Sequence, residues 1–199
     1  MDAADWDERY RGTGLVWEAE PNRFVAQELA GLPAGRAVDL AAGEGRNAVW
    51  LAGQGWDVDA VDFSAVALAK AERLGAERGV ALRTVCSDLA AWSAPEGTYD
   101  LALIAYLQLP WPQMERVLRE AANAVRGGGT LFLVGHAAAN LERGHGGPRD
   151  PGVLCTAEQV AAEWRPRARI VRAEEVTRPV STEQGSRTAI DALVRAVRR

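Results

Sequence analysis

Short apolar segments alternate with longer amphipathic segments along most of the chain. Nearly continuous apolar runs are typical of strands buried on both faces, and the amphipathic runs have the spacing of helices that cover a sheet. Strands are predicted over residues 37–40, 56–62, 82–86, 99–105 and 130–135, and helices over residues 46–53, 65–78, 110–125 and 157–164. This order predicts parallel strands that are joined by helical crossovers.

The C-terminal part of the chain has a different pattern. Residues 138–153 are rich in glycine and proline and predict a long loop that could serve as a lid. Residues 168–176 and 187–195 then predict two strands of a hairpin, with a polar turn at residues 181–186. We therefore expect an α/β protein with a Rossmann-like, doubly wound and mostly parallel seven-stranded sheet, an antiparallel C-terminal hairpin and helices on both faces.

Composition and charge narrow the function classes. With 199 residues, 48% of them hydrophobic, the chain fits a single domain with a real core. The acidic N-terminus and the lack of a long apolar run predict a cytoplasmic protein without a membrane partner. The net charge of −4 and the lack of a stripe of basic and aromatic residues argue against nucleic acid as the main partner. Cys86 and Cys155 share no metal-binding spacing, so we expect buried thiols and no metal.

A glycine-rich turn between the first strand and the first crossover helix carries the clearest chemistry. The residues from Val38 to Asn47 read VDLAAGEGRN, and Gly43 and Gly45 would let a ligand approach the backbone at a helix start. This spacing alone also fits a loose dinucleotide-binding fingerprint. Asp62, at the end of the second strand, could hold ribose hydroxyls in either kind of cofactor.

Asp39 separates these two possibilities. An ionised carboxylate in a core strand is costly unless a positive or hydrogen-bonding group answers it. A pyrophosphate would repel it, whereas the ammonium group of S-adenosylmethionine would pair with it. Asp39 therefore favours S-adenosylmethionine, although a structural role in capping the amides of the loop stays open.

The same residues resemble the glycine motif of the class I S-adenosylmethionine-dependent methyltransferases, in which an acid is followed by glycines at alternate positions. Here Ala41 replaces the first glycine. The likeness continues through Asp62, the Ser87-Asp88-Leu89 segment and the glycine turn at residues 126–131. It implies that Asp62 binds the ribose, that Phe63 lies beside the adenine and that Asp88 accepts from the adenine amino group. The implied cofactor site comprises Asp39, Ala41, Gly43, Gly45, Asn47, Asp62, Phe63, Ser64, Ser87, Asp88, Leu89 and Ala105.

Aromatic residues near the N-terminus resemble the cap segment of the tellurite-resistance and thiopurine-type methyltransferases. They lie at residues 6–10, at Trp17 and at residues 21–25. The resemblance implies one methyltransferase domain over residues 1–199, with a cap at 1–30, a cofactor-binding core at 36–135 and an acceptor side at 136–199. Packing is the alternative role for these aromatic residues.

The resemblance implies in-line methyl transfer to a small-molecule acceptor by a monomer or homodimer. Tyr106 and His136 follow the fourth and fifth strands and are the catalytic candidates, and packing or capping is the alternative for each. Trp17, Tyr106, Arg178 and Arg187 are candidates for binding the acceptor. Few residues can be assigned as a general base, which favours a reactive small acceptor, including an anionic one. An oxygen or nitrogen acceptor would use His136 or Tyr106 as a base.

Two other functions stay open at this point. A nicotinamide-dependent oxidoreductase would share the glycine loop but needs a catalytic Tyr/Lys or Cys/His arrangement, and the single lysine, Lys70, lies on a predicted surface helix. A non-catalytic S-adenosylmethionine-binding module would keep the cofactor residues without an acceptor site. Glu44, inside the loop, fits either a ligand contact or a surface position.

Overall fold

The computed structural model describes residues 3–12, 14–16, 18–183 and 185–199 and contains a seven-stranded sheet of order β3-β2-β1-β4-β5-β7-β6. The strands are β1 (Arg36–Leu40), β2 (Asp57–Asp62), β3 (Arg83–Cys86), β4 (Tyr99–Ala105), β5 (Val125–His136), β6 (Ala168–Thr182) and β7 (Gly185–Arg198). The helices are α1 (Ala3–Tyr10), α2 (Arg23–Leu29), α3 (Arg46–Gly53), α4 (Ala65–Glu77), α5 (Trp111–Ala124), α6 (Asn140–Arg143) and α7 (Ala157–Trp164), with a 3₁₀ turn at Pro151–Val153.

Strand directions confirm the predicted fold class. β1 to β5 pair in parallel, whereas β7 runs antiparallel to both β5 and β6. Several helices begin and end close to their predicted bounds because local sequence signals determine where they start. The side chain of Ser64 accepts from the Ala67 N–H at the start of α4, and Thr156 and Gln159 form a capping box at the start of α7.

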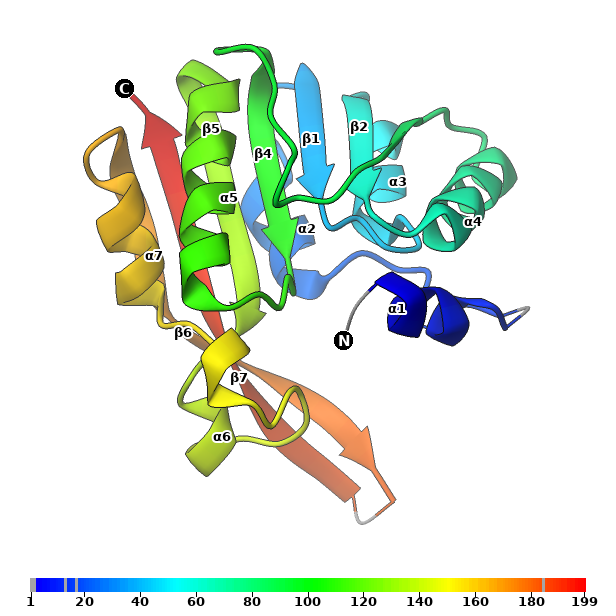
Figure 1. Ribbon diagram of the computed structural model, residues 1–199, viewed down its shortest axis with the longest axis vertical. Helices are drawn as coiled ribbons and strands as arrows, with labels where there is room; N and C mark the ends of the chain where they lie inside the picture. The colour runs from blue at the N-terminus through cyan, green and yellow to red at the C-terminus, as the bar shows by residue number, and fades with distance from the viewer. Residues whose placement is uncertain (1–2, 13, 17, 184) are drawn as a thin grey trace.

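Helices cover both faces of the sheet (Figure 1). α5 and α7 pack on one face, where Leu118 and Trp164 are fully buried. α2, α3 and α4 pack on the other face through residues such as Val25 and Leu51. Neighbouring residues of one strand point to opposite faces, so both cores draw on the same apolar runs. Neither core covers the carboxyl edge of the sheet, where the parallel strands end, and the loops lie at this edge.

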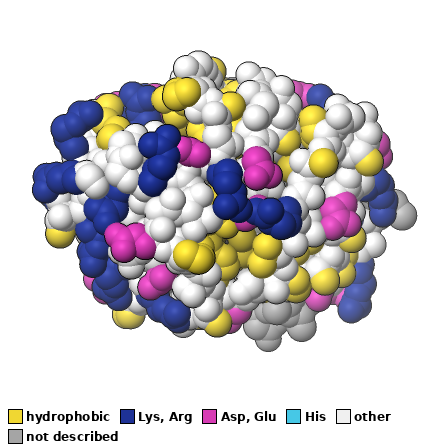
Figure 2. All heavy atoms as spheres, turned by 90° about the horizontal axis from the view of Figure 1, so that it is seen from above, with side chains coloured by type: hydrophobic (Ala, Val, Ile, Leu, Met, Phe, Trp, Pro, Cys, Tyr) yellow, Lys and Arg dark blue, Asp and Glu magenta, His cyan; other side chains and the backbone are white. Residues whose placement is uncertain are grey.

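The β6–β7 hairpin extends past that carboxyl edge, as Figure 1 shows below the arrowhead of β4. His136, the last residue of β5, pairs with Asp191 of β7, and Asp191 pairs with Val176 of β6. The hairpin residues beyond this register therefore have no sheet neighbour in β5 and stand next to α6. The opposite end, where the parallel strands begin, is seen in Figure 2, and basic and acidic side chains are interspersed there.

Three segments differ from the sequence-based expectation. The hairpin is longer than predicted and turns between Thr182 and Gly185. The segment 138–153 contains α6 and a 3₁₀ turn, so it is partly helical instead of a plain loop. β5 starts at Val125, before the glycines of the predicted turn, of which Gly128 has a positive φ of 82°, and its pairing with β4 shifts in register at this stretch. Within the described residues, no helix is long and apolar enough to cross a membrane.

Candidate functional site

The glycine loop joins β1 to α3 at the carboxyl edge. Ala41, Gly43 and Gly45 all have positive φ angles, of 66°, 54° and 82°. Gly45 lacks a side chain because a Cβ there would lie 2.5 Å from the Cβ of Ala71 in α4, so its role in this structure is close helix packing. Ala41 occupies a left-handed conformation that costs a non-glycine residue about 1–2 kcal/mol. The loop therefore keeps the backbone course of a glycine motif at some cost in strain.

Asp39 is the most unusual group of the loop region. Its side chain is fully buried, and neither carboxylate oxygen has a hydrogen-bond partner among the residues that the structure describes. The pKa of Asp39 is raised to about 7, mainly by burial and also by the Asp62 carboxylate, while Arg46 and the Ala48 amide oppose the shift. The Ala48 amide makes no hydrogen bond to either oxygen. Such an uncompensated carboxylate is expected where a positively charged ligand group binds.

Asp62 lies at the end of β2 and organises the loop around it. One oxygen accepts from the Gly43 N–H at 2.9 Å and the other from the Ser64 N–H at 2.9 Å. Burial raises the pKa of Asp62, and these backbone N–H groups oppose the shift. Asp62 therefore caps the backbone N–H groups of the glycine loop and of the residue that precedes α4. Each oxygen has a second lone pair, so the carboxylate can also accept from a ligand.

The end of β3 lies next to Asp62. Ser87 donates its backbone N–H to the Asp62 carbonyl, and Asp88 accepts from the Ala90 N–H at 2.8 Å. The Asp88 side chain is exposed, whereas Leu89 is buried. Cys86 is exposed and within 3.4 Å of the Phe63 carbonyl, so the expectation of two buried thiols is wrong for Cys86 and right for Cys155. β3 is an edge strand, which explains the exposure.

The N-terminal segment packs on the glycine loop. Asp7 of α1 accepts from the Ser64 hydroxyl, and the Tyr10 hydroxyl lies 3.2 Å from where a Cβ of Gly43 would stand. Trp6 and Tyr10 stack on each other with ring centroids 5.5 Å apart. These contacts place α1 over the loop, as Figure 1 shows at the carboxyl edge. Trp17, a predicted acceptor contact, lies outside the described residues.

A buried ion pair also fixes this segment. Lys70 of α4 donates to Glu44 at 2.9 Å and to the Gly14 carbonyl at 2.6 Å, and Glu44 accepts from the Val16 N–H at 2.8 Å. The side chains of Lys70 and Glu44 are only 9% and 4% exposed. The prediction that Lys70 lies on a surface helix is therefore wrong, because the N-terminal segment covers this part of α4.

The acceptor-side candidates gather at the ends of β4 and β5. The Tyr106 hydroxyl donates to Asp191 at 2.7 Å and accepts from Asn22 at 3.2 Å and from Arg178 at 3.0 Å. Burial and the Asp191 carboxylate raise the pKa of Tyr106, so its hydroxyl is protonated and acts as a donor. The ring of His136 meets that of Tyr106 edge-on, with centroids 4.9 Å apart.

Tyr106 also has a positive φ of 57°. A non-glycine residue in this conformation costs about 1–3 kcal/mol and is found where a site dictates the backbone course. Tyr106 and His136 line a small hollow of about 10 Å³, which is room for one water molecule. Ala105, the last residue of β4, packs partly buried beside them. Asn47, at the start of α3, accepts from the Asn22 N–H and so connects the loop helix with this group.

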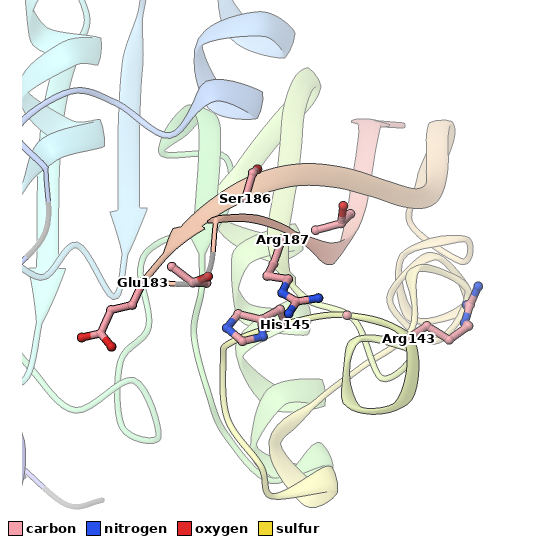
Figure 3. Close-up of a pocket in the computed structure, with 8 residues that line it drawn as sticks. Arg143, His145, Glu183, Ser186 and Arg187 are labelled. Carbon is pink, nitrogen blue, oxygen red and sulfur yellow. The ribbon is translucent and has the colours of Figure 1, made fainter.

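The two arginine candidates occupy different places. Arg178 is bound to Asp191 at 2.7 Å, so its charge is balanced inside the protein. Arg187 lines an open groove of about 710 Å³ between the hairpin tip and the segment around α6. In Figure 3 the Arg187 and His145 side chains converge, whereas Arg143 and Glu183 point away from each other. Asp191, which joins Tyr106 to Arg178, was missed by sequence reasoning, although a carboxylate within an apolar strand is the signal that singled out Asp39.

The fold and the site together define a class of enzyme. A buried carboxylate before a glycine loop, an acid at the end of the next strand and this strand order are those of the class I methyltransferases. Residues 37–129 match the family described as Methyltransferase domain. A phosphatidylethanolamine N-methyltransferase from Cereibacter sphaeroides is 30% identical over 155 residues, which cover 76% of this chain and 69% of that relative. The chain belongs to the class I S-adenosylmethionine-dependent methyltransferases, whose cofactor is S-adenosylmethionine.

Two further curated relatives are longer than this chain. A glycine/sarcosine N-methyltransferase from Halorhodospira halochloris is 41% identical over 87 residues, covering 44% of this chain and 30% of that protein. A ribosomal RNA small subunit methyltransferase C from Chromohalobacter salexigens is 31% identical over 150 residues, covering 65% of this chain and 44% of that protein. The chain thus spans less than half the length of these two relatives, and their acceptors differ in class.

Solved structures show the same fold over the whole chain. TehB from Haemophilus influenzae superposes with a TM-score of 0.74 at 16% identity, covering 99% of this chain and 67% of that one. The N-methyltransferase NodS from Bradyrhizobium japonicum WM9, in complex with S-adenosyl-l-homocysteine, gives a TM-score of 0.72 at 16% identity and covers 98% and 97%. The family membership decides against the nicotinamide-dependent alternative.

Proposed function

We propose that this chain transfers a methyl group from S-adenosylmethionine to a small-molecule acceptor. The observation that supports it most is Asp39, whose two buried oxygens have no hydrogen-bond partner among the described residues. A cationic amino-acid end would satisfy this carboxylate, whereas the phosphates of a dinucleotide would not.

The remaining cofactor residues surround that point on four neighbouring segments. Asp62 offers its spare lone pairs to the ribose, and Asp88 offers an exposed carboxylate to the adenine amino group. Phe63, directly after Asp62, is half-buried and offers apolar surface to the adenine, and Leu89 is buried directly after Asp88. The proposed cofactor site consists of Asp39, Ala41, Gly43, Gly45, Asn47, Asp62, Phe63, Ser64, Ser87, Asp88, Leu89 and Ala105.

The acceptor side supports a small molecule. Tyr106 and His136 lie at the carboxyl ends of β4 and β5, where they line a small hollow. Arg143 of α6 and Arg187 of β7 line the open groove from two sides, and Glu183 and the hydroxyl groups of Thr182, Ser186 and Thr188 line it from the hairpin. We assign this groove to an anionic group of the acceptor, with the reacting atom reaching toward Tyr106 and His136.

The chain's contribution to the chemistry is mostly positional. S-adenosylmethionine supplies an activated methyl group, and its sulfur leaves as a neutral thioether. Holding the acceptor in line and excluding water can contribute about 7–11 kcal/mol to lowering the barrier. The N-terminal segment, which packs on the glycine loop through Asp7 and Tyr10, is suited to excluding water.

The direct test is a turnover screen with isotopically labelled methyl donor and a panel of acceptors. The panel contains small amines, thiols, hydroxyl compounds and oxyanions, and in parallel ribosomal RNA, unfolded protein and phosphatidylethanolamine vesicles. We expect methylation of a member of the small-molecule group, and loss of it in Asp39→Asn. Asp57→Asn, which changes a carboxylate at the opposite end of β2, is the matched control and should retain turnover. Label in RNA, protein or lipid only would contradict the small-molecule acceptor.

A further inference from the structure

Asp191 is a fully buried carboxylate in the middle of β7, at the point where β5 ends. One of its oxygens is saturated, because it accepts from the Tyr106 hydroxyl at 2.7 Å and from Nε of Arg178 at 2.7 Å. Burial by itself raises the pKa of Asp191, but the contacts with His136, Tyr106 and Arg178 outweigh it, and the pKa is lowered. The group is therefore a carboxylate, which accepts hydrogen bonds and donates none.

The second oxygen faces the ring of His136. Oδ1 of Asp191 lies 3.5 Å from Nδ1 of His136. Both atoms are buried, and neither has a hydrogen-bond partner in the part of the chain that the structure describes. Because Oδ1 of Asp191 and Nδ1 of His136 are both buried and face each other, we expect them to form a hydrogen bond when a proton lies between them. Since Asp191 has no proton to give, the proton must be on Nδ1.

The imidazole has little room to turn. Gly147, which has a φ of +78°, covers one face of the ring, because a Cβ there would lie 2.8 Å from Nδ1 and 2.9 Å from both Cε1 and Cγ. The Tyr106 ring packs against the imidazole in a T-shaped arrangement, and the His136 side chain is 12% exposed. The charged and titratable groups around His136 are Asp191 from β7, Tyr106 after β4, Arg178 from β6 through Asp191, and the buried Cys155 thiol across the hollow.

We propose that Asp191 is a positioning residue of the acceptor site, which holds His136 in the tautomer with the proton on Nδ1 and leaves Nε2 to accept a proton from the acceptor. This inference rests on the proposed function and deepens it. It predicts an acceptor whose reacting atom carries a proton, such as an amine, a hydroxyl or a thiol. A permanently anionic reacting atom would need no such base.

The proton and electron count closes with these groups. The acceptor atom gives its proton to Nε2 of His136 and uses its electron pair for the bond to the methyl carbon, while the electrons of the broken carbon–sulfur bond stay on sulfur. His136 is left as the cation, which Asp191 stabilises, and it returns the proton to water. Tyr106 and Arg178 keep their protons throughout, because both already donate to Asp191.

The same carboxylate connects the acceptor side to the cofactor side. From Asp191 the hydrogen bonds run through the Tyr106 hydroxyl to the side chain of Asn22, and the Asn22 backbone N–H donates to Asn47. Asn47 stands at the start of α3, directly after the glycine loop. A continuous chain of hydrogen bonds that includes Asp191 thus joins the acceptor side to the start of α3.

Nitrogen NMR of the ring tautomers tests the pairing directly. The chain has two histidines, and the exposed His145 serves as an internal reference. At a pH where the ring is neutral, we expect the His136 proton on Nδ1 in the wild-type protein and a loss of this preference in Asp191→Asn. A His136 proton on Nε2 in the wild-type protein would overturn the proposal.

Kinetics then test the role in turnover. Asp191→Asn should lower kcat by about 10²–10⁴-fold, the usual contribution of a general base, and leave the affinity for S-adenosylhomocysteine within about threefold. Combined with His136→Gln, it should cost little beyond His136→Gln alone, because residues that act as a unit are not additive. Asp59→Asn is the matched control, since Asp59 is also buried and accepts from a tyrosine hydroxyl, that of Tyr99 at 2.6 Å.

The outcomes separate the two proposals. Additive losses of kcat in the double variant, or an unchanged kcat in Asp191→Asn, would overturn the positioning role. Absence of turnover with every acceptor would remove the proposed function, while the tautomer measurement would still decide whether Asp191 and His136 pair.

Discussion

Replacing Asp39 by asparagine should stabilise the cofactor-free protein while it abolishes cofactor binding. The carboxyl group is fully buried, and its pKa is raised from 3.8 to about 7, mainly by burial and further by Asp62. In the unfolded chain the same group is ionised well below neutral pH. The folded protein therefore carries an uncompensated charge that the asparagine variant lacks.

The size of the effect follows from the pKa difference. One pKa unit corresponds to 1.36 kcal/mol, so ionising Asp39 in the folded protein costs about 4 kcal/mol more than in the unfolded chain. Because the folded pKa is the higher one, the folded state keeps its proton between about pH 4 and pH 7, where the unfolded chain has lost it. The wild-type protein should lose stability across this window and level off above it. For a chain of this size, 1 kcal/mol shifts Tm by about 2–4 °C.

Calorimetric unfolding of both proteins between pH 4.5 and 8.5, without cofactor, measures this difference. The Tm of Asp39→Asn relative to wild type should rise across the window, whereas Asp57→Asn, with an exposed carboxylate, should run parallel to wild type. S-adenosylmethionine at 100 times its Kd should add about 2.7 kcal/mol to the wild-type protein and almost nothing to Asp39→Asn. A Tm difference independent of pH would refute the claim that Asp39 is buried without a partner.

Three further substitutions have defined expectations. Ala41→Gly relieves a positive φ of 66° and should raise Tm by about 2–4 °C, for a strain of about 1 kcal/mol, in a thermal scan. Lys70→Met removes the cation that balances the buried Glu44 carboxylate, so denaturant unfolding should show a loss of about 3–5 kcal/mol, and the double variant with Glu44→Gln should recover part of it. Gly147→Ala places a Cβ 2.8 Å from Nδ1 of His136 and should lower kcat at least about tenfold. Gly146 has a similar positive φ but no atom within 4 Å of the Cβ position, so Gly146→Ala should leave kcat unchanged.

Local signals explain which elements the sequence predicts well. The helix over residues 46–53 and the strand over residues 99–105 have the predicted bounds, since a glycine loop precedes the first and a continuous apolar run makes up the second. Ser64 and Thr156 mark helix starts through their own side chains. Signals of this kind act within a few residues, so they can be read from the chain without knowing its neighbours in space.

The features that escaped prediction depend on residues far apart in the chain. Lys70 is buried because Gly14 and Glu44 meet it across the N-terminal segment, and the helix that carries it shows no sign of this. The role of Asp191 depends on its contacts with Tyr106, which is 85 residues away, and with Arg178 on the neighbouring strand. Both are charged residues in apolar surroundings, which is a signal of burial, but their partners are defined only by the tertiary structure.

The central claim is that Asp39 and the glycine loop bind an adenosyl amino acid for methyl transfer. The most direct measurement is a calorimetric titration of the purified protein with S-adenosylmethionine, S-adenosylhomocysteine and NAD, repeated with Asp39→Asn. We predict micromolar binding of both adenosyl ligands, no binding of NAD, and loss of adenosyl binding in the variant. Binding of NAD alone, or adenosyl binding that Asp39→Asn leaves unchanged, would contradict the account.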